Sequence, residues 1–229
     1  MKSDKKNHHM ILTRLLHATK GYHSTVFRRL HLMNARILIM FILAFLLAGC
    51  VSTGSGDSSE FVRTADKAPP KVDPKAAASY EMALVSMRAG NESRAEKQFT
   101  QLTKDYPEFS GPHNNLGILH YRAGNIEKAK AAFESALKIN PDSVVSLNYL
   151  GIISRGNGEF KQAQGYYEKA LRADPNYAYA HLNYGILLEL YMGKLPKALE
   201  HYKRYQELTE EEDKKVKGWI IELSRRIKN

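Results

Sequence analysis

Residues 110–143, SGPHNNLGILHYRAGNIEKAKAAFESALKINPDS, and the 34 residues that follow, VVSLNYLGIISRGNGEFKQAQGYYEKALRADPNY, carry one pattern of small, aromatic and proline residues. The pattern extends toward the N-terminus, so that four residue types recur at intervals of 34. They are Gly90, Gly124 and Gly158; Ala95, Ala129 and Ala163; Phe99, Phe133 and Tyr167; and Pro107, Pro141 and Pro175. A fixed period of this length is typical of stacked helical hairpins, in which each unit buries its apolar face against its neighbours.

Each recurring residue has a physical role within the hairpin. Gly117 and Gly151 lie in the first helix of their units, where a side chain would push the second helix away. The loop glycine supplies the positive φ that a short turn needs, and the proline ends the second helix. Ala129 and Phe133 lie four residues apart, and therefore on one face of the second helix. This face is the predicted core, and the sequence predicts an all-α fold.

The last part of the chain departs from the strict period. Three residues of the pattern return only if one residue is inserted in the turn at Met192–Gly193, namely Gly185, Ala198 and Tyr202. Thr209 to Glu212 is predicted to form a capping box for a final amphipathic helix. We expect Trp219 on its apolar side to cover the end of the stack, because a terminal unit exposes a hydrophobic face.

These motifs resemble the tetratricopeptide repeat family over about residues 76–209. The resemblance implies a right-handed superhelix of four helix-turn-helix repeats and a C-terminal capping helix. The repeats are expected at about 76–109, 110–143, 144–177 and 178–212, with the capping helix at 212–229.

The N-terminal region has a different character. Residues 37–49 form an uncharged apolar run that ends at the single cysteine, Cys50. A helix of this length rises only about 20 Å, which is too short for a hydrocarbon core of about 30 Å. Residues 1–49 are therefore predicted to be a signal peptide.

The boundary Leu47-Ala48-Gly49-Cys50 resembles the lipobox of bacterial lipoproteins. The resemblance implies cleavage before Cys50, a diacylglycerol on its thiol and acylation of its new amino group. Val51 is, by the same resemblance, permissive for export to the outer membrane, where the domain would face the periplasm.

The basic stretch before the apolar run is long for a signal peptide. A start at Met33 gives a compact signal and is the interpretation we favour. Met10 is another candidate start, and a cytoplasmic extension that is removed with the signal is the alternative.

The segment 50–75 is rich in Ser, Gly, Pro, Lys and Asp, and we expect a flexible linker of roughly 28 Å behind the lipidated cysteine. Residues 1–49 contribute +7 of the formal charge of +10, so the mature chain keeps only +3. The electrostatic argument for nucleic-acid binding disappears with the signal peptide.

No pattern of catalytic or metal-binding residues can be made out. The histidines of the mature chain lack metal-ligand spacing, and His113 and His181 are predicted to be partly buried packing residues. Neither a Ser-His-Asp order nor a phosphate-binding glycine loop is present. The sequence therefore predicts no enzyme, no metal, no small-molecule substrate and no cofactor apart from the covalent lipid on Cys50.

Recognition of a protein remains, because solenoids bind extended peptides or helices along their concave side. In the family, the first helix of each hairpin lines this groove, which implies partner contacts by Tyr80, Arg88, Asn114, Tyr121, Arg122, Asn148, Arg155, Tyr179 and Leu182. Arginines can pair with carboxylates, and tyrosines offer contact area at low entropic cost. Packing between units is an equal alternative for Ile118, Ile152 and Ile186. The Lys and Asn pattern with which chaperone-binding members hold a C-terminal carboxylate is not reproduced.

Two function classes fit a lipid-anchored chain of this kind. The first is an assembly scaffold for an envelope machine, since lipobox and repeats together resemble the pilotin lipoproteins of type IV pilus secretins and the repeat lipoproteins of gliding motility. The second is a periplasmic adaptor for peptidoglycan hydrolases or a protease. In both classes the partners are envelope proteins, and the lipid holds the chain at the membrane.

Overall fold

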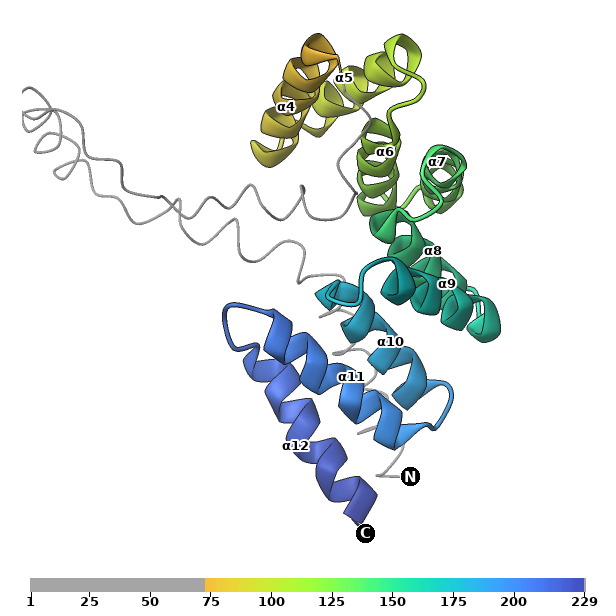
Figure 1. Ribbon diagram of the computed structural model, residues 1–229, viewed down its shortest axis with the longest axis vertical. Coiled ribbons are helices and arrows are strands. Elements are labelled where there is room, and N and C mark those ends of the chain that lie inside the picture. The colour runs from red at the N-terminus through yellow and green to blue at the C-terminus, as the bar shows by residue number, and fades with distance from the viewer. Residues whose placement is uncertain (1–72, 229) are drawn as a thin grey trace, which may run out of the picture. The chain divides into compact units, whose positions relative to one another are not determined.

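The computed structural model describes residues 73–228, and every regular element among them is an α-helix (Figure 1). The helices are α4 (Pro74–Arg88), α5 (Glu92–Asp105), α6 (Ser110–Arg122), α7 (Ile126–Ile139), α8 (Val144–Gly156), α9 (Phe160–Ala173), α10 (Ala178–Leu190), α11 (Leu195–Leu208) and α12 (Lys214–Lys228). The prediction of an all-α fold is confirmed. The expectations for the signal peptide, Cys50 and the linker up to residue 72 concern residues outside the described range.

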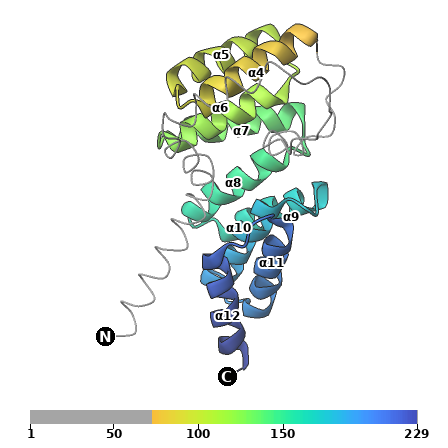
Figure 2. The ribbon, with the colours of Figure 1, turned by 90° about the vertical axis from the view of Figure 1, so that its left-hand side faces the viewer.

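The helices pack in chain order. Helices α4 and α5, α6 and α7, α8 and α9, and α10 and α11 form hairpins, and each hairpin packs on the next. Helix α8 also contacts α6 and α10 directly, so the first helices of the last three hairpins lie side by side. Figure 2 shows α12 alongside α11 at the C-terminal end of this stack.

The turns within the hairpins depend on glycine. Gly90, Gly124 and Gly158 have φ of 77°, 77° and 80°, which side chains rarely tolerate. In the fourth hairpin this place is taken by Gly193, with φ of 64°. Its turn is one residue longer, because residues 191–194 separate α10 from α11 whereas residues 157–159 separate α8 from α9. The predicted insertion is thus confirmed.

The repeated core positions are buried as the pattern predicted. Ala95, Phe99, Ala129, Phe133, Ala163, Tyr167, Ala198 and Tyr202 all have 0% exposure. The small residues of the first helices permit this packing. A Cβ atom on Gly151 would lie 2.5 Å from Cε1 of Tyr167, and one on Gly117 would lie 2.5 Å from Cε1 of Phe133.

Helix α12 covers the last hairpin. Val216 and Leu223 are fully buried, and the ring of Trp219 lies 5.7 Å from that of Tyr202, centre to centre. The predicted capping box is wrong. Asp213 caps α12 instead, because its Oδ1 accepts hydrogen bonds from the backbone amides of residues 215 and 216, while the hydroxyl of Thr209 donates back to the end of α11.

Candidate functional site

The predicted partner-binding residues lie on α4, α6, α8 and α10, the first helices of the four hairpins. One group remains at least partly exposed: Tyr80, Arg88, Tyr121, Arg122 and Tyr179. The other group is buried, with exposures of 1–4%: Asn114, Asn148, Arg155 and Leu182. Contact of either group with a partner stays a prediction, but the buried group has internal roles that the repeat pattern did not show.

Asn114 joins the second and third hairpins. Its Oδ1 atom accepts a hydrogen bond of 3.1 Å from the hydroxyl of Ser143 and a second, shorter one from Ser146. Ser146 lies on α8, and Ser143 directly precedes the first residue of that helix, so both bonds connect α6 to the start of α8. The amide carbonyl that was expected to hold a partner's backbone is therefore occupied within the protein.

Asn148 has the equivalent role one repeat later. Its Oδ1 accepts a 3.1 Å hydrogen bond from Nδ2 of Asn183, which joins α8 to α10. Asn115 similarly donates to the hydroxyl of Tyr80 at 2.6 Å and joins α6 to α4. Asn115 and Asn183 were not among the predicted site residues, although Asn183 follows Asn148 by 35 residues. That near-repeat spacing was the signal available.

Two buried charged residues, Arg155 and Glu189, lie in the last turns of α8 and α10, one period of 34 residues apart. Two described residues donate to the carboxylate of Glu189: Arg226 donates to its Oε1 at 2.7 Å and the Tyr202 hydroxyl donates to its Oε2 at 2.9 Å. Within the described part of the chain, Arg155 donates to a single group, the backbone carbonyl of Asn183, at 3.3 Å. The two sites thus differ in how well their charges are neutralised.

The positive charge of Arg155 influences the pKa of Tyr167. Burial raises the pKa of Tyr167 to about 12, and the positive charge of Arg155 opposes this increase. Burial also raises the pKa of Tyr121, again opposed by Arg155. Among the described residues the hydroxyl of Tyr167 has no hydrogen-bond partner.

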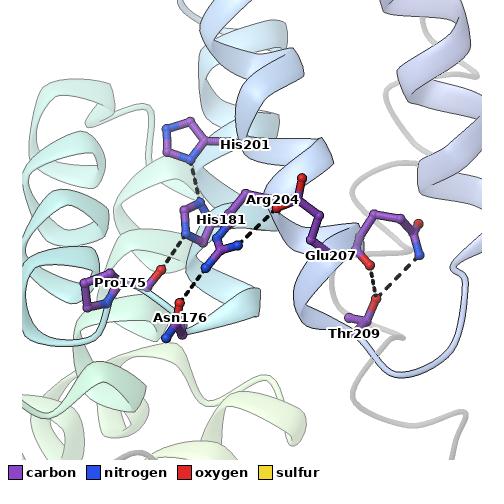
Figure 3. Close-up of polar contacts among 8 residues, drawn as sticks. Pro175, Asn176, His181, His201, Arg204, Glu207 and Thr209 are labelled. Carbon is purple, nitrogen blue, oxygen red and sulfur yellow. Dashed lines mark hydrogen bonds and ion pairs between the residues drawn. The ribbon is translucent and has the colours of Figure 1, made fainter.

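A histidine pair connects α10 to α11 (Figure 3). Nδ1 of His181 lies 2.9 Å from Nδ1 of His201, and Nε2 of His181 lies 3.0 Å from the carbonyl oxygen of Pro175. Because this carbonyl can only accept, Nε2 of His181 carries a proton and a neutral His181 offers a lone pair to the Nδ1–H of His201. Burial lowers the pKa of His201 to about 4, and the facing His181 and Lys197 act in the same direction.

Arg204 strengthens the same junction. One guanidinium nitrogen donates to Asn176 at 2.6 Å and another pairs with Glu207 at 3.0 Å (Figure 3). The histidine pair and Arg204 together attach α11 to the segment between α9 and α10. His113 is half-buried as predicted, and burial lowers its pKa.

Within residues 73–228, no group of three or more His, Cys, Asp or Glu side chains is arranged to hold a metal ion. None of the described helices combines the length and the apolarity that crossing a membrane requires.

Three family models, each described as tetratricopeptide repeat, match residues 77–108, 108–176 and 150–213. Together they cover residues 77–213, which is more than half of the chain. The chain belongs to the tetratricopeptide repeat family. Its helices thus form the all-α superhelical fold of that family, and tetratricopeptide repeat domains generally bind protein partners. No curated protein matches the chain.

Solved tetratricopeptide repeat structures resemble this domain in fold. MamA from Desulfovibrio magneticus is 20% identical, with a TM-score of 0.55 over 68% of this chain and 87% of its own. PilF of Pseudomonas aeruginosa is 17% identical, with a TM-score of 0.59 over 67% of this chain and 69% of its own.

An O-GlcNAc transferase of Thermobaculum terrenum is 23% identical, with a TM-score of 0.51 over 59% of this chain but only 28% of its own length. At these identities the likeness concerns the repeat fold alone. Tetratricopeptide repeat proteins are generally non-catalytic scaffolds.

Proposed function

We propose that this tetratricopeptide repeat protein is a lipid-anchored scaffold of the bacterial envelope, held at the outer membrane through Cys50 with its repeats in the periplasm. Its task is to bind envelope proteins and assist the assembly of a machine such as a type IV pilus secretin or a motility complex. The observation that carries the proposal is the sequence Leu47-Ala48-Gly49-Cys50 directly behind an apolar run and ahead of a protein-binding fold.

The number of acyl chains determines how firmly a lipoprotein is attached to the membrane. One acyl chain gives marginal membrane attachment, at about 0.8 kcal/mol per buried CH₂, whereas the several chains of a processed lipoprotein give stable attachment. A linker behind Cys50 would then let the repeats reach partners beyond the lipid surface.

The fold supports the scaffold role through its geometry. The first helices lie side by side, and partly exposed tyrosine and arginine side chains alternate along them: Tyr80, Arg88, Tyr121, Arg122 and Tyr179. Aromatic residues and arginine are the types that contribute most to protein interfaces.

Metabolic labelling tests the anchor. Cells that express the chain are grown with an alkyne analogue of palmitate, and the wild type is compared with Cys50→Ala. We expect a labelled, shortened wild-type protein in the outer-membrane fraction and an unlabelled, full-length variant. An unlabelled wild type would refute the lipid anchor.

Affinity capture tests the scaffold. Proteins captured from envelopes by the wild type are compared by mass spectrometry with those captured by Arg88→Ala/Arg122→Ala and by the control Lys128→Ala/Lys161→Ala, whose lysines are exposed on the second helices. We expect loss of partners only with the arginine variant. Pilus or motility proteins would support the proposal, and peptidoglycan hydrolases or a protease would favour the adaptor instead. Equal capture by both variants would contradict the assigned surface.

A further inference from the structure

The third and fourth hairpins contain the same three-residue arrangement with opposite charges. In the fourth, the ring of Tyr202 packs against Gly185, and Glu189 stands one helical turn beyond that glycine. In the third, the ring of Tyr167 packs against Gly151, and Arg155 stands one turn beyond it. Residues four apart lie on one face of a helix, so the charged group is positioned above the tyrosine in both hairpins.

In the fourth hairpin the buried charge is paired with donors from the same chain. The Tyr202 hydroxyl and the Arg226 guanidinium both donate to the Glu189 carboxylate, at 2.9 and 2.7 Å. One acceptor with negative charge thus receives two donors, one of them positively charged. The buried charge of Glu189 is compensated within the chain.

In the third hairpin the acceptor is missing. Arg155 is only 4% exposed, yet it forms no ion pair with a described carboxylate and makes one long hydrogen bond, to the Asn183 carbonyl. The Tyr167 hydroxyl is 0% exposed and lacks a described partner. The α8 carboxyl-terminal dipole compensates the arginine only in part.

A buried charge without a counter-ion is costly, and a guanidinium has five donors arranged to hold a carboxylate. Among the described residues, no carboxylate forms an ion pair with the guanidinium of Arg155.

We propose that Arg155 and the Tyr167 hydroxyl form a binding site for a carboxylate of the protein partner. The carboxylate would take the place that the Glu189 side chain has in the fourth hairpin. The inference rests on the proposed protein-binding function, because it names the chemistry that the partner must offer, and it does not depend on the lipid anchor.

Short peptides serve as probes for the site. The full chain is purified in a non-ionic detergent with ¹⁵N label, and the Nε–H signal of Arg155 is followed by NMR. The probes are acetyl-Gly-Glu-Gly-amide, with a side-chain carboxylate, acetyl-Gly-Gly-Gly with a free C-terminus, and the neutral acetyl-Gly-Gln-Gly-amide. We expect a saturable shift with at least one carboxylate probe and none with the glutamine probe. The two carboxylate probes distinguish an acidic side chain from a chain terminus.

Two variants separate binding from folding. Tyr167→Phe removes only a hydroxyl without a partner, and phenylalanine stands at this register in the first two hairpins, so the fold should persist. Arg155→Met removes the uncompensated charge. Tyr167→Phe, followed at the Nε–H signal of Arg155, and Arg155→Met, followed at the backbone amide signals of α8, are each expected to bind the carboxylate probe about tenfold more weakly, the effect of losing a hydrogen bond to a charged group.

Thermal unfolding of the same proteins supplies a second readout. Arg155→Met and Tyr167→Phe should melt at the wild-type temperature or higher, because both remove poorly satisfied polar groups. Glu189→Gln, the matched control in the fourth hairpin, should melt lower because it weakens an internal ion pair. A lower melting temperature for Arg155→Met would show that the arginine has a structural role and would overturn the site.

Equal shifts with the glutamine probe, or no shift with either carboxylate probe, would also overturn it. Capture of envelope partners by the wild type alongside such a result would show that the scaffold function stands and only the carboxylate site is wrong.

Discussion

The tight contact between α8 and α9 makes Gly151 the most informative position for mutation. An alanine there would place its Cβ atom 2.5 Å from Cε1 and 2.8 Å from Cζ of Tyr167. The ring is fully buried and cannot move away cheaply. Overpacking of a core typically costs about 1–3 kcal/mol, and the better helix propensity of alanine returns about 1 kcal/mol. We take the upper end for this ring and expect a net loss of about 2 kcal/mol.

Gly165 provides a matched control. It lies in the interior of α9, and a Cβ atom there would meet nothing within 4 Å. Gly165→Ala should therefore stabilise the protein by about 1 kcal/mol through helix propensity alone. In a domain of this size, 1 kcal/mol corresponds to about 2–4 °C in melting temperature.

The assay is thermal unfolding followed by far-ultraviolet circular dichroism, because this signal reports the helix content of the protein. Gly151→Ala should melt about 4–8 °C below the wild type and Gly165→Ala about 2–4 °C above it. The first hairpin carries Ala83 at this register. If Gly151→Ala melted at or above the wild-type temperature, the close contact of glycine and aromatic ring would not be what sets the helix spacing.

Three further outcomes are expected. Trp219→Ala should cost about 3–5 kcal/mol because the side chain is buried against the last hairpin, whereas Ile221→Ala, 45% exposed on the same helix, should change stability by less than about 0.5 kcal/mol; equal melting temperatures for the two would argue against the role of α12 as a cap. The pKa values of His181 and His201 are lowered in the folded state, so below the ordinary histidine pKa of about 6.5 these side chains bind more protons in the unfolded chain than in the folded one. The free energy of unfolding should therefore fall by about 2 kcal/mol between pH 7 and pH 4. His201→Gln should reduce this loss, which melting temperatures measured across that pH range would show. Gly158→Ala should cost about 1–2 kcal/mol because an L-residue is strained at this positive φ, while no atom lies within 4 Å of the added methyl group. An unchanged denaturant midpoint would contradict this.

The repeat pattern predicted much of the fold because its information is local. The small residue, the alanine and the aromatic residue of a hairpin contact one another within a single unit of 34 residues, so their spacing indicates both helices and the face that is buried. The turn glycines are local in the same sense, since a positive φ concerns one residue.

The predicted capping box failed for a related reason. Thr209 and Glu212 have the right spacing, but Asp213 is also a good N-cap residue, and the path of the chain after α11 decides which of the two is used. Sequence spacing alone does not distinguish competing caps that lie four residues apart.

The sequence by itself determined that this chain is a stack of helical hairpins with a covering helix, and it identified the register of the core. Only the tertiary structure decided which polar residues of the first helices face a neighbouring hairpin. Asn114 and Asn148 form hydrogen bonds between helices, Glu189 forms an ion pair with Arg226, and Arg155 forms no ion pair with a carboxylate of residues 73–228. The reason is that these contacts depend on the rotation and distance between successive hairpins, which the 34-residue period does not specify.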